Sequence, residues 1–374
     1  MGTIFQFPYR TVAEVSIRAI IKNLVTLRSV SQREIVPVVK ADAYGHGLLP
    51  VAKALVTRGS CHSLCVATLE EAIELRKKIP YAISIWVLSG FLPHQLDAYI
   101  KYRLTPVIHS LNHLKSLLNH NRLPDIHLKL DSGMHRLGLL PSEMPEAYLT
   151  LTKLGIKLSG LATHFAESEN TLSKFADEQI QVFHDVYQEL IHRKLIQTDA
   201  KIHVANTGGI LRKKLGLSFS VRPGIGLYGI SPNPKLSHSE SLVPALSWKA
   251  RVLSVKQLTP QDTVGYGRTY TAKRREKIAI VAVGYADGFP RMLSNEGMVI
   301  VGGKKVSVRG RVSMDLTAID CPLTSSTKEG SLVTLIGKEG KHSVSAWDVA
   351  NWARTIPYEI LCGISPRVPR IYLD

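Results

Sequence analysis

At 374 residues the chain is long for one domain, and two domains are the expected arrangement. Hydrophobic residues make up 45% and charged residues 21%, a globular composition that excludes a disordered or fibrous chain. The net charge of +17 raises nucleic acid as a partner, but the basic residues form short scattered groups without interleaved aromatic residues. The charge therefore predicts solubility and attraction of anions, and no nucleic-acid partner.

No stretch is apolar over the roughly 20 residues that a membrane-spanning helix needs. The first residues, MGTIFQFPYR, lack the basic and then apolar segments of an export signal. The 4 cysteines are too few for a disulfide scaffold, and Cys61 and Cys65 have no matching second pair for a zinc site. We therefore expect a cytoplasmic protein with no membrane partner and no metal.

From about residue 14 to residue 230, short apolar runs alternate with longer amphipathic stretches. Stretches 69–78 and 178–194 place apolar residues three and four positions apart, which predicts helices. Apolar runs predict strands at residues 35–40, 63–68, 83–89, 105–109, 126–131, 160–165, 202–207 and 221–226. Eight strands alternating with helices favour a parallel (β/α)8 barrel. A doubly wound open sheet is the structural alternative.

The pattern changes after residue 230. Segment 231–244, SPNPKLSHSESLVP, has three prolines, four serines and no periodicity, which is typical of a linker. Beyond it, short strands separated by glycine turns predict a mostly antiparallel β domain. The predicted domains are thus a barrel over 1–240 and a C-terminal β domain over 241–374. The first ten or so residues could join the β domain instead.

In such a barrel, chemistry takes place at the carboxyl ends of the strands. The sequence places these residues there: Lys40 and Tyr44, Lys129 and Arg136, His164, His203 with Asn206 and Thr207, and Arg222 with Gly224. A single histidine at a strand end more often completes a hydrogen bond of the core than takes part in chemistry. A lysine, two arginines and two histidines on one rim indicate a functional site.

The stretch VVKADAYGHG, residues 38–47, places Lys40 at the tip of an apolar run, where burying an ammonium is costly. One interpretation is that the side chain leaves the strand and extends into water. The other is that the amine is kept neutral and nucleophilic, as in Schiff-base chemistry. The fragment alone favours the first interpretation.

The stretch GIGLYG, residues 224–229, matches the GxGxxG pattern of dinucleotide-binding folds. That pattern needs a helix directly after it and an acidic residue about twenty positions on. Here ISPNP follows, and the stretch around Lys249 offers no carboxylate, so we reject a dinucleotide site. The glycines instead suit a backbone that points its N–H groups at a phosphate.

Nine stretches together carry a more specific signal than any single motif. In chain order they are VVKADAYGHG, LKLDSGMHRLGL, THFA, HVANTGG, VRPGIGLYG, VGYGRTY, VGYADGFPR, GRVSMD and ISPRVPRIY. From about residue 9 to its end, the chain resembles the alanine racemases, fold-type III enzymes that use pyridoxal 5'-phosphate. The resemblance implies a racemase that interconverts L-alanine and D-alanine and supplies D-alanine for peptidoglycan.

By resemblance, Lys40 forms the imine with the cofactor, which explains a lysine at the tip of an apolar run. The implied phosphate ligands are hydroxyls and backbone N–H groups, which suit a dianion. They are Tyr44, Thr207, Gly224, Ile225 and Tyr358. Thr207 stands where serine is common and keeps the hydroxyl, and Asn206 fits the close approach of its loop. Without the resemblance, Tyr358 would be taken for a buried aromatic residue.

The family also implies that Arg222 faces the pyridine nitrogen of the cofactor. An aspartate there would keep the ring protonated, whereas an arginine cannot accept a proton. The ring nitrogen then stays neutral, which favours proton return over decarboxylation or transamination.

Inverting an α-carbon requires removal of a proton from one face and delivery to the other. The resemblance assigns Lys40 to one face and Tyr266 to the opposite one. A phenol with a pKa of about 10 is a poor base unless cations favour its anion, so His164 is expected to link Arg222 to Tyr266. By the same resemblance, Arg136 and the backbone of Met314 are expected to contact the substrate or the cofactor. His203, Tyr285 and Asp315 are expected to occupy supporting positions around the site.

The family further implies a homodimer in which the β domain of one subunit caps the barrel of the other. Tyr266 and Met314 would then complete the partner's site.

Two other classes of protein compete with this interpretation. A basic-amino-acid decarboxylase would carry a carboxylate against the ring nitrogen and a cysteine acid, which Arg222 and Tyr266 oppose. A barrel that only carries the cofactor would not need the second domain.

Lys129 lies on an apolar strand seven residues before Arg136. Burial and a neighbouring arginine would both disfavour its ammonium form. We hypothesise that Lys129 reacts with carbon dioxide to give a carbamate that pairs with Arg136. The alternative is a plain lysine with a lowered pKa.

Overall fold

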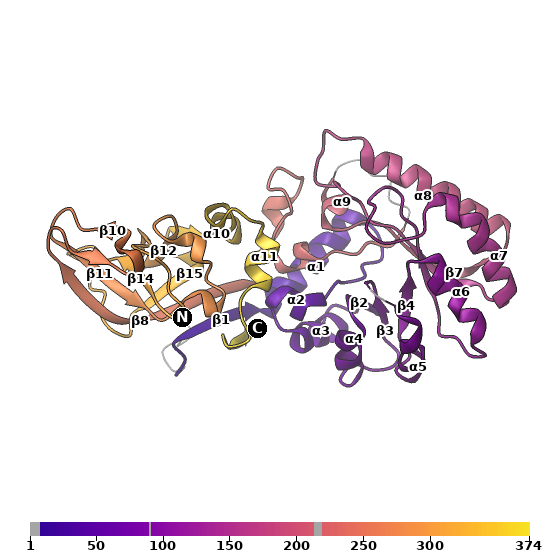
Figure 1. Ribbon diagram of the computed structural model, residues 1–374, viewed down its shortest axis with the longest axis horizontal. Helices are drawn as coiled ribbons and strands as arrows, with labels where there is room; N and C mark the ends of the chain where they lie inside the picture. Colours follow the sequence, from indigo (N-terminus) through magenta and orange to yellow (C-terminus); the bar gives the residue numbers. More distant parts are fainter. Residues whose placement is uncertain (1–7, 90, 213–218) are drawn as a thin grey trace. The chain divides into compact units, whose positions relative to one another are not determined.

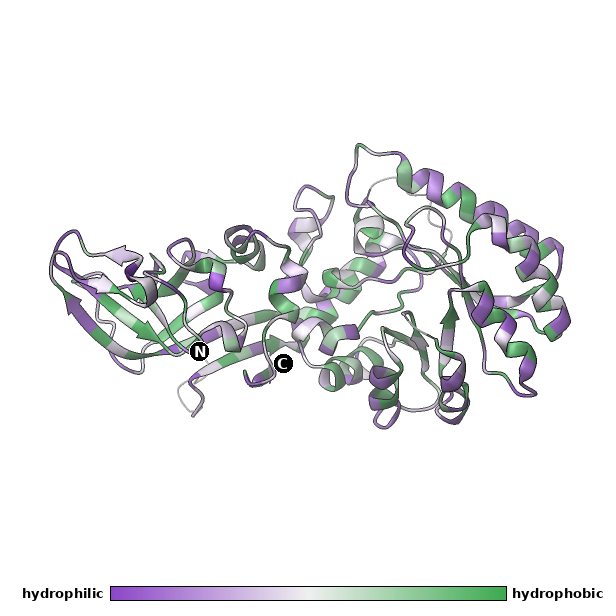
Figure 2. Cartoon of the chain, in the orientation of Figure 1, coloured by the Kyte–Doolittle hydropathy of each residue, from purple (hydrophilic) through white to green (hydrophobic). Residues whose placement is uncertain are grey.

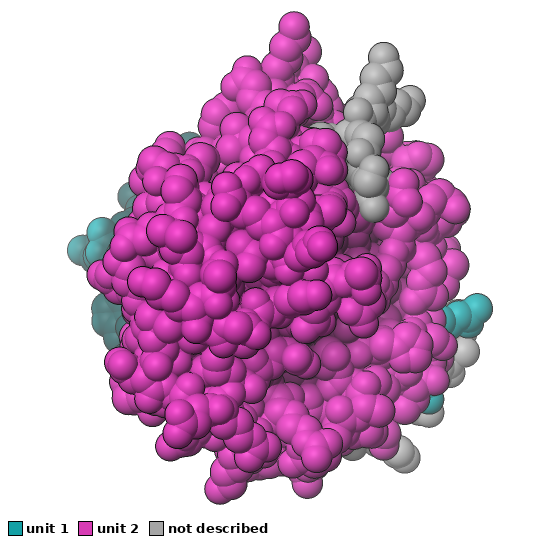
Figure 3. Space-filling view, turned by 90° about the vertical axis from the view of Figure 1, so that its right-hand side faces the viewer, with its two compact units in different colours: residues 1–18, 44–46, 244–374 teal, residues 19–43, 47–243 magenta. Residues whose placement is uncertain are grey.

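The computed structural model describes residues 8–89, 91–212 and 219–374, and the chain forms two compact units. Unit 1 comprises Met1–Arg18, Tyr44–His46 and Pro244–Asp374, and unit 2 comprises Ala19–Ala43 and Gly47–Val243. Figure 3 distinguishes the two units by colour. Each unit has its own sheet and its own core, so each is described by itself.

Unit 2 contains a parallel sheet whose strands follow one another in chain order (Figure 1). The strands are β2 (Ser63–Val66), β3 (Ser84–Val87), β4 (Thr105–Ile108), β5 (His127–Lys129), β6 (Leu158–Ala162) and β7 (Ile196–His203). Helices that connect or flank them are α1 (Ile17–Ser31), α3 (Leu48–Thr57), α4 (Leu69–Arg76), α5 (Leu96–Lys101), α6 (Leu111–Ser116), α7 (Met144–Leu154), α8 (Phe175–His192) and α9 (Thr207–Leu211). Polar and apolar residues are mixed along the whole length of α8 (Figure 2). The buried residues are spaced so that they lie on one face of the helix.

Two further extended segments join the edges of this sheet through isolated parallel bridges. Ile35 pairs with Val221, Val38 with Cys65 of β2, and Ser220 with His203 of β7. Eight parallel segments therefore follow one another around a ring, which is the (β/α)8 barrel expected from the sequence.

The two joining segments are less regular than the sequence predicts. The expected strand 35–40 forms only isolated bridges, because Pro37 has no N–H to donate and a helical turn already begins at Lys40. The expected strand 221–226 ends early, because Pro223 likewise lacks a donor and a 3-10 turn runs over Ile225–Tyr228. Pro37 lies three residues before Lys40, and Pro223 lies directly before Gly224.

Alternate strands of the barrel contribute a polar and aromatic layer to its interior. Trp86 of β3, His127 of β5 and His203 of β7 are all buried. The ring centroids of Trp86 and each histidine are 4.6 Å apart. Layers built from every second strand are the normal way in which such a barrel fills its centre.

Unit 1 is built on a nine-stranded sheet in which nearly all neighbours are antiparallel. Its strands are β1 (Thr11–Ser16), β8 (Leu246–Leu258), β11 (Glu276–Val281), β12 (Met298–Val301), β13 (Lys304–Ser307), β14 (Thr317–Asp320), β15 (Leu332–Glu339), β16 (His342–Val344) and β17 (Arg370–Leu373). A small sheet of β9 (Thr263–Val264) and β10 (Tyr270–Thr271) and the helices α10 (Ala346–Ala353) and α11 (Pro357–Cys362) complete the unit.

The strand β1 comes from the start of the chain and pairs with β8 and, in parallel, with β17. The segment before β8, residues 231–244, contains one short 3-10 turn over Ser239–Ser241 and no strand or helix. The sequence analysis did not anticipate α10 and α11. Among the described residues, no helix combines the length and apolar character needed to cross a membrane.

Asn23 of α1 ties that helix to two other parts of unit 2, and its side chain is buried. Its Nδ2 donates to Leu227 O (3.0 Å) and Val243 O (2.8 Å), and its Oδ1 accepts from Val243 N (2.8 Å). Asn23→Ala should lower the free energy of unfolding by about 2–4 kcal/mol, because buried backbone groups lose their partners. Denaturant unfolding measures this. The control is Lys22→Ala, an exposed position in the same helix, and equal stability of the two variants would contradict the prediction.

Candidate functional site

Arg222 lies at the centre of the polar residues that the sequence analysis assigned to the barrel rim. Its guanidinium is buried and has acceptors on both terminal nitrogens. Nη1 donates to the carbonyl oxygen of His203 and to His203 Nδ1 (2.7 Å). Nη2 donates to Thr163 O (2.7 Å) and Val204 O (3.2 Å), and lies 3.4 Å from His164 Nδ1. Burial lowers the pKa of Arg222 to about 10, so it remains a cation at neutral pH.

The partners of Arg222 fix the protonation of two buried histidines. An arginine only donates, so His203 Nδ1 must accept and the proton of His203 must lie on Nε2. His203 Nε2 is 2.9 Å from His127 Nδ1, which therefore accepts in turn. Burial and the charge of Arg222 lower the pKa of both histidines, that of His127 to about 3, in agreement with two neutral rings. His127 was not anticipated from the sequence, where it is one polar residue within an apolar strand.

Positive charge accumulates around this centre. Burial, and then the charges of Arg222 and Arg136, lower the pKa of Lys129 to about 8, with a smaller contribution from Lys40. Burial and the same four cations lower the pKa of His164 well below its usual value. These shifts show that two lysines and two arginines lie near one another, as the sequence analysis expected.

One carboxylate, that of Asp131, raises the pKa of Lys129. Its Oδ1 already accepts the N–H groups of Gly133 and His135, both at 3.0 Å, and thereby shapes the loop that carries Arg136. Among the described residues, Asp131 is thus the carboxylate that acts on Lys129, against the charges of Arg222, Arg136 and Lys40. Among the residues that the structure describes, no group of three or more histidine, cysteine, aspartate or glutamate side chains could hold a metal.

Thr207, Gly224 and Gly226 form a close arrangement of hydroxyl and amide groups. Thr207 Oγ1 accepts from Gly224 N (3.2 Å) and Gly226 N (3.1 Å). A Cβ at Gly226 would lie 2.6 Å from Thr207 Cγ2, so this position has no room for a side chain. Asn206 caps α9 by accepting from Gly209 N (3.0 Å). Since Thr207 Oγ1 accepts both of these N–H groups, its own O–H can donate, and a hydroxyl donor near several cations suits a phosphate.

The chain after Lys40 adopts an unusual conformation. In α2 (Lys40–Gly45), residues Ala41, Asp42, Ala43 and Tyr44 have φ between 52° and 55°, which is a left-handed turn. At roughly 1–2 kcal/mol for each residue with a side chain, this turn costs of order 4–8 kcal/mol. Strain of this size directly after Lys40 indicates that the position of this lysine matters for function.

Tyr44 and Tyr358 lie close together within unit 1, with ring centroids 6.1 Å apart. The backbone of Gly45 packs against α11, since a Cβ there would lie 2.2 Å from Leu361 O. Gly45 O also accepts from Arg370 Nε at 3.1 Å. The two tyrosines that the sequence analysis assigned to one phosphate are therefore neighbours in the structure.

Three other predicted site residues lie on exposed loops of unit 1. Tyr266 is 72% exposed, Met314 53% and Tyr285 44%. The loops of Tyr285 and Met314 are joined by hydrogen bonds from Tyr285 N to Ser313 O and from Ala286 N to Met314 O, each 3.0 Å.

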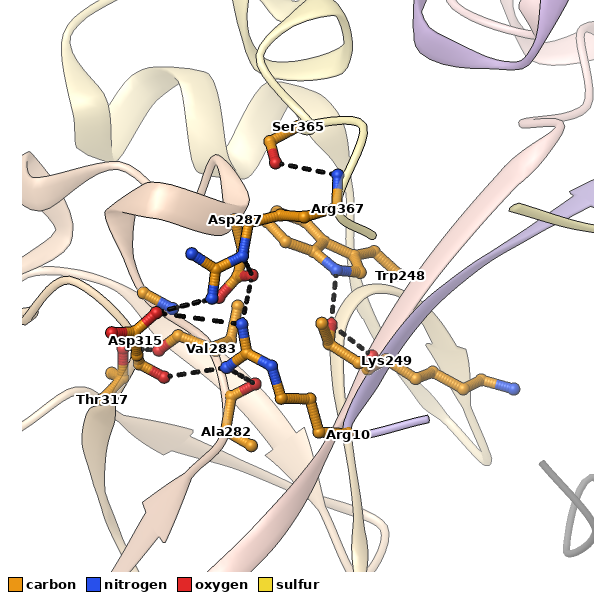
Figure 4. A network of polar contacts seen from close by, with 12 residues as sticks. Arg10, Trp248, Lys249, Ala282, Val283, Asp287, Asp315, Thr317, Ser365 and Arg367 are labelled. Atoms are coloured by element: carbon orange, nitrogen blue, oxygen red, sulfur yellow. Dashed lines mark hydrogen bonds and ion pairs between the residues drawn. The ribbon is translucent and has the colours of Figure 1, made fainter. Parts of the chain in front are cut away.

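A buried carboxylate holds these loops in place (Figure 4). Asp287 binds Arg10 Nη2 at 2.7 Å, Arg367 Nε at 3.0 Å and Gly284 N at 3.0 Å. Arg367 also binds Asp315 at 2.6 Å, so the predicted residue Asp315 belongs to this network. The sequence analysis missed Asp287 and Arg10, which are 277 residues apart in the chain.

The fold and the donor set thus define a barrel with a cationic, phosphate-compatible mouth and a second, β-rich unit. Family models described as alanine racemase N-terminal domain and C-terminal domain match residues 15–232 and 245–372. The alanine racemase of Halothermothrix orenii is 41% identical over 373 residues, which cover 97% of this chain and 96% of that protein.

Two solved structures are also similar to this chain. The alanine racemase of Bacillus anthracis with bound L-Ala-P has a TM-score of 0.89 at 34% identity, over 98% of this chain and 96% of the other. That of Bartonella henselae with covalently bound pyridoxal phosphate has a TM-score of 0.87 at 29% identity, over 98% and 100%. The chain therefore belongs to the alanine racemase family, a family of isomerases.

The lowered pKa of Lys129 makes the hypothesis of its carbamylation testable. Only a neutral amine reacts with carbon dioxide, and with a pKa of about 8 the neutral fraction rises steeply between pH 7 and pH 8. Protein in 13C-bicarbonate should show a carbamate carbon signal that grows over this interval and is absent in Lys129→Arg. The exposed Lys153 supplies the control variant, Lys153→Arg, which should keep the signal. A signal that survives in Lys129→Arg, or a bare amine in high-resolution density at neutral pH, would contradict the hypothesis.

Proposed function

We propose that this protein is a pyridoxal-phosphate-dependent racemase that interconverts L-alanine and D-alanine in the cytoplasm and supplies D-alanine for peptidoglycan. The observation that carries the proposal is the group of cations around Arg222, in which Lys129, Arg136 and Lys40 act electrostatically on one another and on His164. Membership of the alanine racemase family, and the cofactor and ligand named for two similar structures, support the cofactor and the substrate.

The residues of the barrel and of unit 1 suit the phosphate of this cofactor. Thr207 and the N–H groups of the glycine-rich turn supply hydroxyl and amide donors in unit 2, with Asn206 shaping their loop. Tyr44 and Tyr358 supply two phenolic hydroxyls in unit 1. When bound, pyridoxal phosphate supplies an imine carbon and an electron-withdrawing ring that acidify the α-hydrogen of an amino acid.

Arg222 is assigned to the pyridine nitrogen and selects the reaction. It donates there and cannot accept a proton, so it leaves the ring nitrogen neutral and weakens the ring as an electron sink. His203 and the backbone carbonyls hold the guanidinium in position. This argues for return of the proton to the α-carbon, and against the decarboxylase that the sequence analysis kept as an alternative.

Lys40 and Tyr266 are assigned as the two bases. Lys40 takes or returns a proton on one face of the α-carbon with its amine, and Tyr266 does so on the other face with its phenol. A phenolate needs nearby positive charge, which Arg222 would provide, with the neutral imidazole of His164 as the contact between them. Arg136 and the backbone N–H of Met314 are assigned to the substrate carboxylate, with Tyr285 at the entrance to the site.

We further propose a homodimer in which each barrel receives Tyr266, Met314 and Tyr285 from the β unit of the partner subunit. The exposure of these three side chains supports this, because a catalytic phenol that is 72% exposed lacks the surroundings that could activate it. Asp287 and Asp315 would then keep the donated loops in shape.

The test uses purified protein with pyridoxal phosphate and L-alanine, and measures D-alanine with a D-specific enzyme. Lys40→Ala should reduce the rate by three orders of magnitude or more, on the order of what a positioned acid–base group contributes. It should also abolish the cofactor adduct that borohydride fixes on the protein. The exposed Lys53→Ala is the matched control and should keep both properties.

Two results would overturn the proposal. One is a wild-type protein that forms the adduct but produces no D-alanine. The other is an adduct of undiminished yield on Lys40→Ala.

A further inference from the structure

The left-handed turn after Lys40 is strained, and something in the fold must hold it. Ala41 to Tyr44 all carry side chains at positive φ, although glycine is the residue that tolerates this conformation. Released from its contacts, this segment would return to a right-handed or extended conformation. Lys40 would then change direction, because it is the residue directly before the turn.

Glu71 makes a contact that its place in the sequence does not require. It is the third residue of α4, and with Thr68 it forms a capping box, in which Thr68 Oγ1 accepts from Glu71 N (3.3 Å) and Glu71 Oε2 from Thr68 N (3.3 Å). Oε2 also accepts from Ala67 N at 2.8 Å. This one oxygen satisfies the cap, which is the usual task of a glutamate there.

The second oxygen of Glu71 reaches the turn. Oε1 accepts from Ala41 N at 2.6 Å, across 30 residues of chain. That N–H lies in the same peptide plane as the carbonyl of Lys40, so the bond fixes ψ of Lys40 and the orientation of the first left-handed residue. A charged acceptor makes this bond stronger than a neutral one would be.

Other hydrogen bonds within unit 2 hold the far end of the turn. Asp42 Oδ1 accepts from Leu48 N at 2.7 Å, and Asp42 O accepts from Gly47 N at 2.9 Å. Ala43 N donates to Val39 O at 2.9 Å, which closes the turn on the segment that precedes Lys40.

We propose that Glu71 is a positioning residue for Lys40, which holds the start of the left-handed turn through Ala41 N and so directs the lysine toward the cofactor. This inference rests on the proposed function only for the role of Lys40. The hydrogen bond from Ala41 N to Glu71 Oε1, called the clamp below, belongs to the chain itself and can be measured without cofactor.

The experiment compares Glu71→Ala with Thr68→Ala. Both variants lose the capping box, but only Glu71→Ala loses the bond to Ala41 N. Hydrogen exchange of the peptide covering residues 41–47, measured on the apoprotein, should be about tenfold faster or more in Glu71→Ala and near wild type in Thr68→Ala, because a charged hydrogen bond is lost. With cofactor, Glu71→Ala should form the borohydride-fixed adduct more slowly and show a lower kcat at similar KM for alanine.

Glu71→Gln is the second variant, in case Glu71→Ala does not fold. The amide keeps one acceptor oxygen and cannot satisfy both the cap and Ala41, so its exchange and kcat should fall between those of Glu71→Ala and wild type. Equal exchange of residues 41–47 in Thr68→Ala and in the folded Glu71 variants would refute the clamp. If the clamp is seen in the apoprotein but wild type forms no adduct, the proposed function fails while the inference about the turn stands.

Discussion

The buried guanidinium of Arg222 is the constraint on which the site depends. Removing a cation from water is costly, and the barrel offers it carbonyls and neutral imidazoles instead of a carboxylate. These acceptors satisfy the two terminal nitrogens but are uncharged, so they do not neutralise the guanidinium. Lys129, Arg136 and Lys40 add to that charge, as the lowered pKa values of Lys129 and His164 record. A ligand with several negative charges would relieve this repulsion, and a phosphate-bearing cofactor with a carboxylate substrate has such charges.

The same constraint accounts for the interior of the barrel. Because Arg222 donates to His203 Nδ1, the proton of His203 lies on Nε2 and is passed as a hydrogen bond to His127. The ring of His127 in turn lies against Gly160 of the next strand, where a Cβ would be 2.5 Å from its Cδ2. The hydrogen bonds that the buried guanidinium needs thus account for the polar layer in the core, the glycine in β6 and the orientation of Arg222.

The sequence predicted the repeating strands and helices of the barrel well, because parallel strands buried on both faces are short apolar runs and the helices between them have strong periodicity. It predicted less well the two segments at Pro37 and Pro223, where the missing N–H groups reduce strands to isolated bridges. The residues placed at the carboxyl ends of the predicted strands include Lys129, His164, His203 and Arg222, and the structure brings these four together. Sequence reasoning could not find Glu71, His127 or Asp287, because their roles depend on contacts 30, 76 and 277 residues away in the chain. In their local sequence they look like an ordinary helix cap, core residue and turn residue, respectively.

We propose that a complete site takes Lys40 from one subunit and Tyr266 from the other. Lys40→Ala and Tyr266→Phe homodimers, unfolded together in equal amounts and refolded, test it most directly. Random pairing makes half of the dimers hybrids, and each hybrid would have one site with both defects and one intact site. Racemase activity should then return to roughly a quarter of the wild-type value, although each variant alone is nearly inactive. No recovery in a sample in which hybrid dimers are shown to form would contradict the claim, and would place both residues of a site in the same subunit.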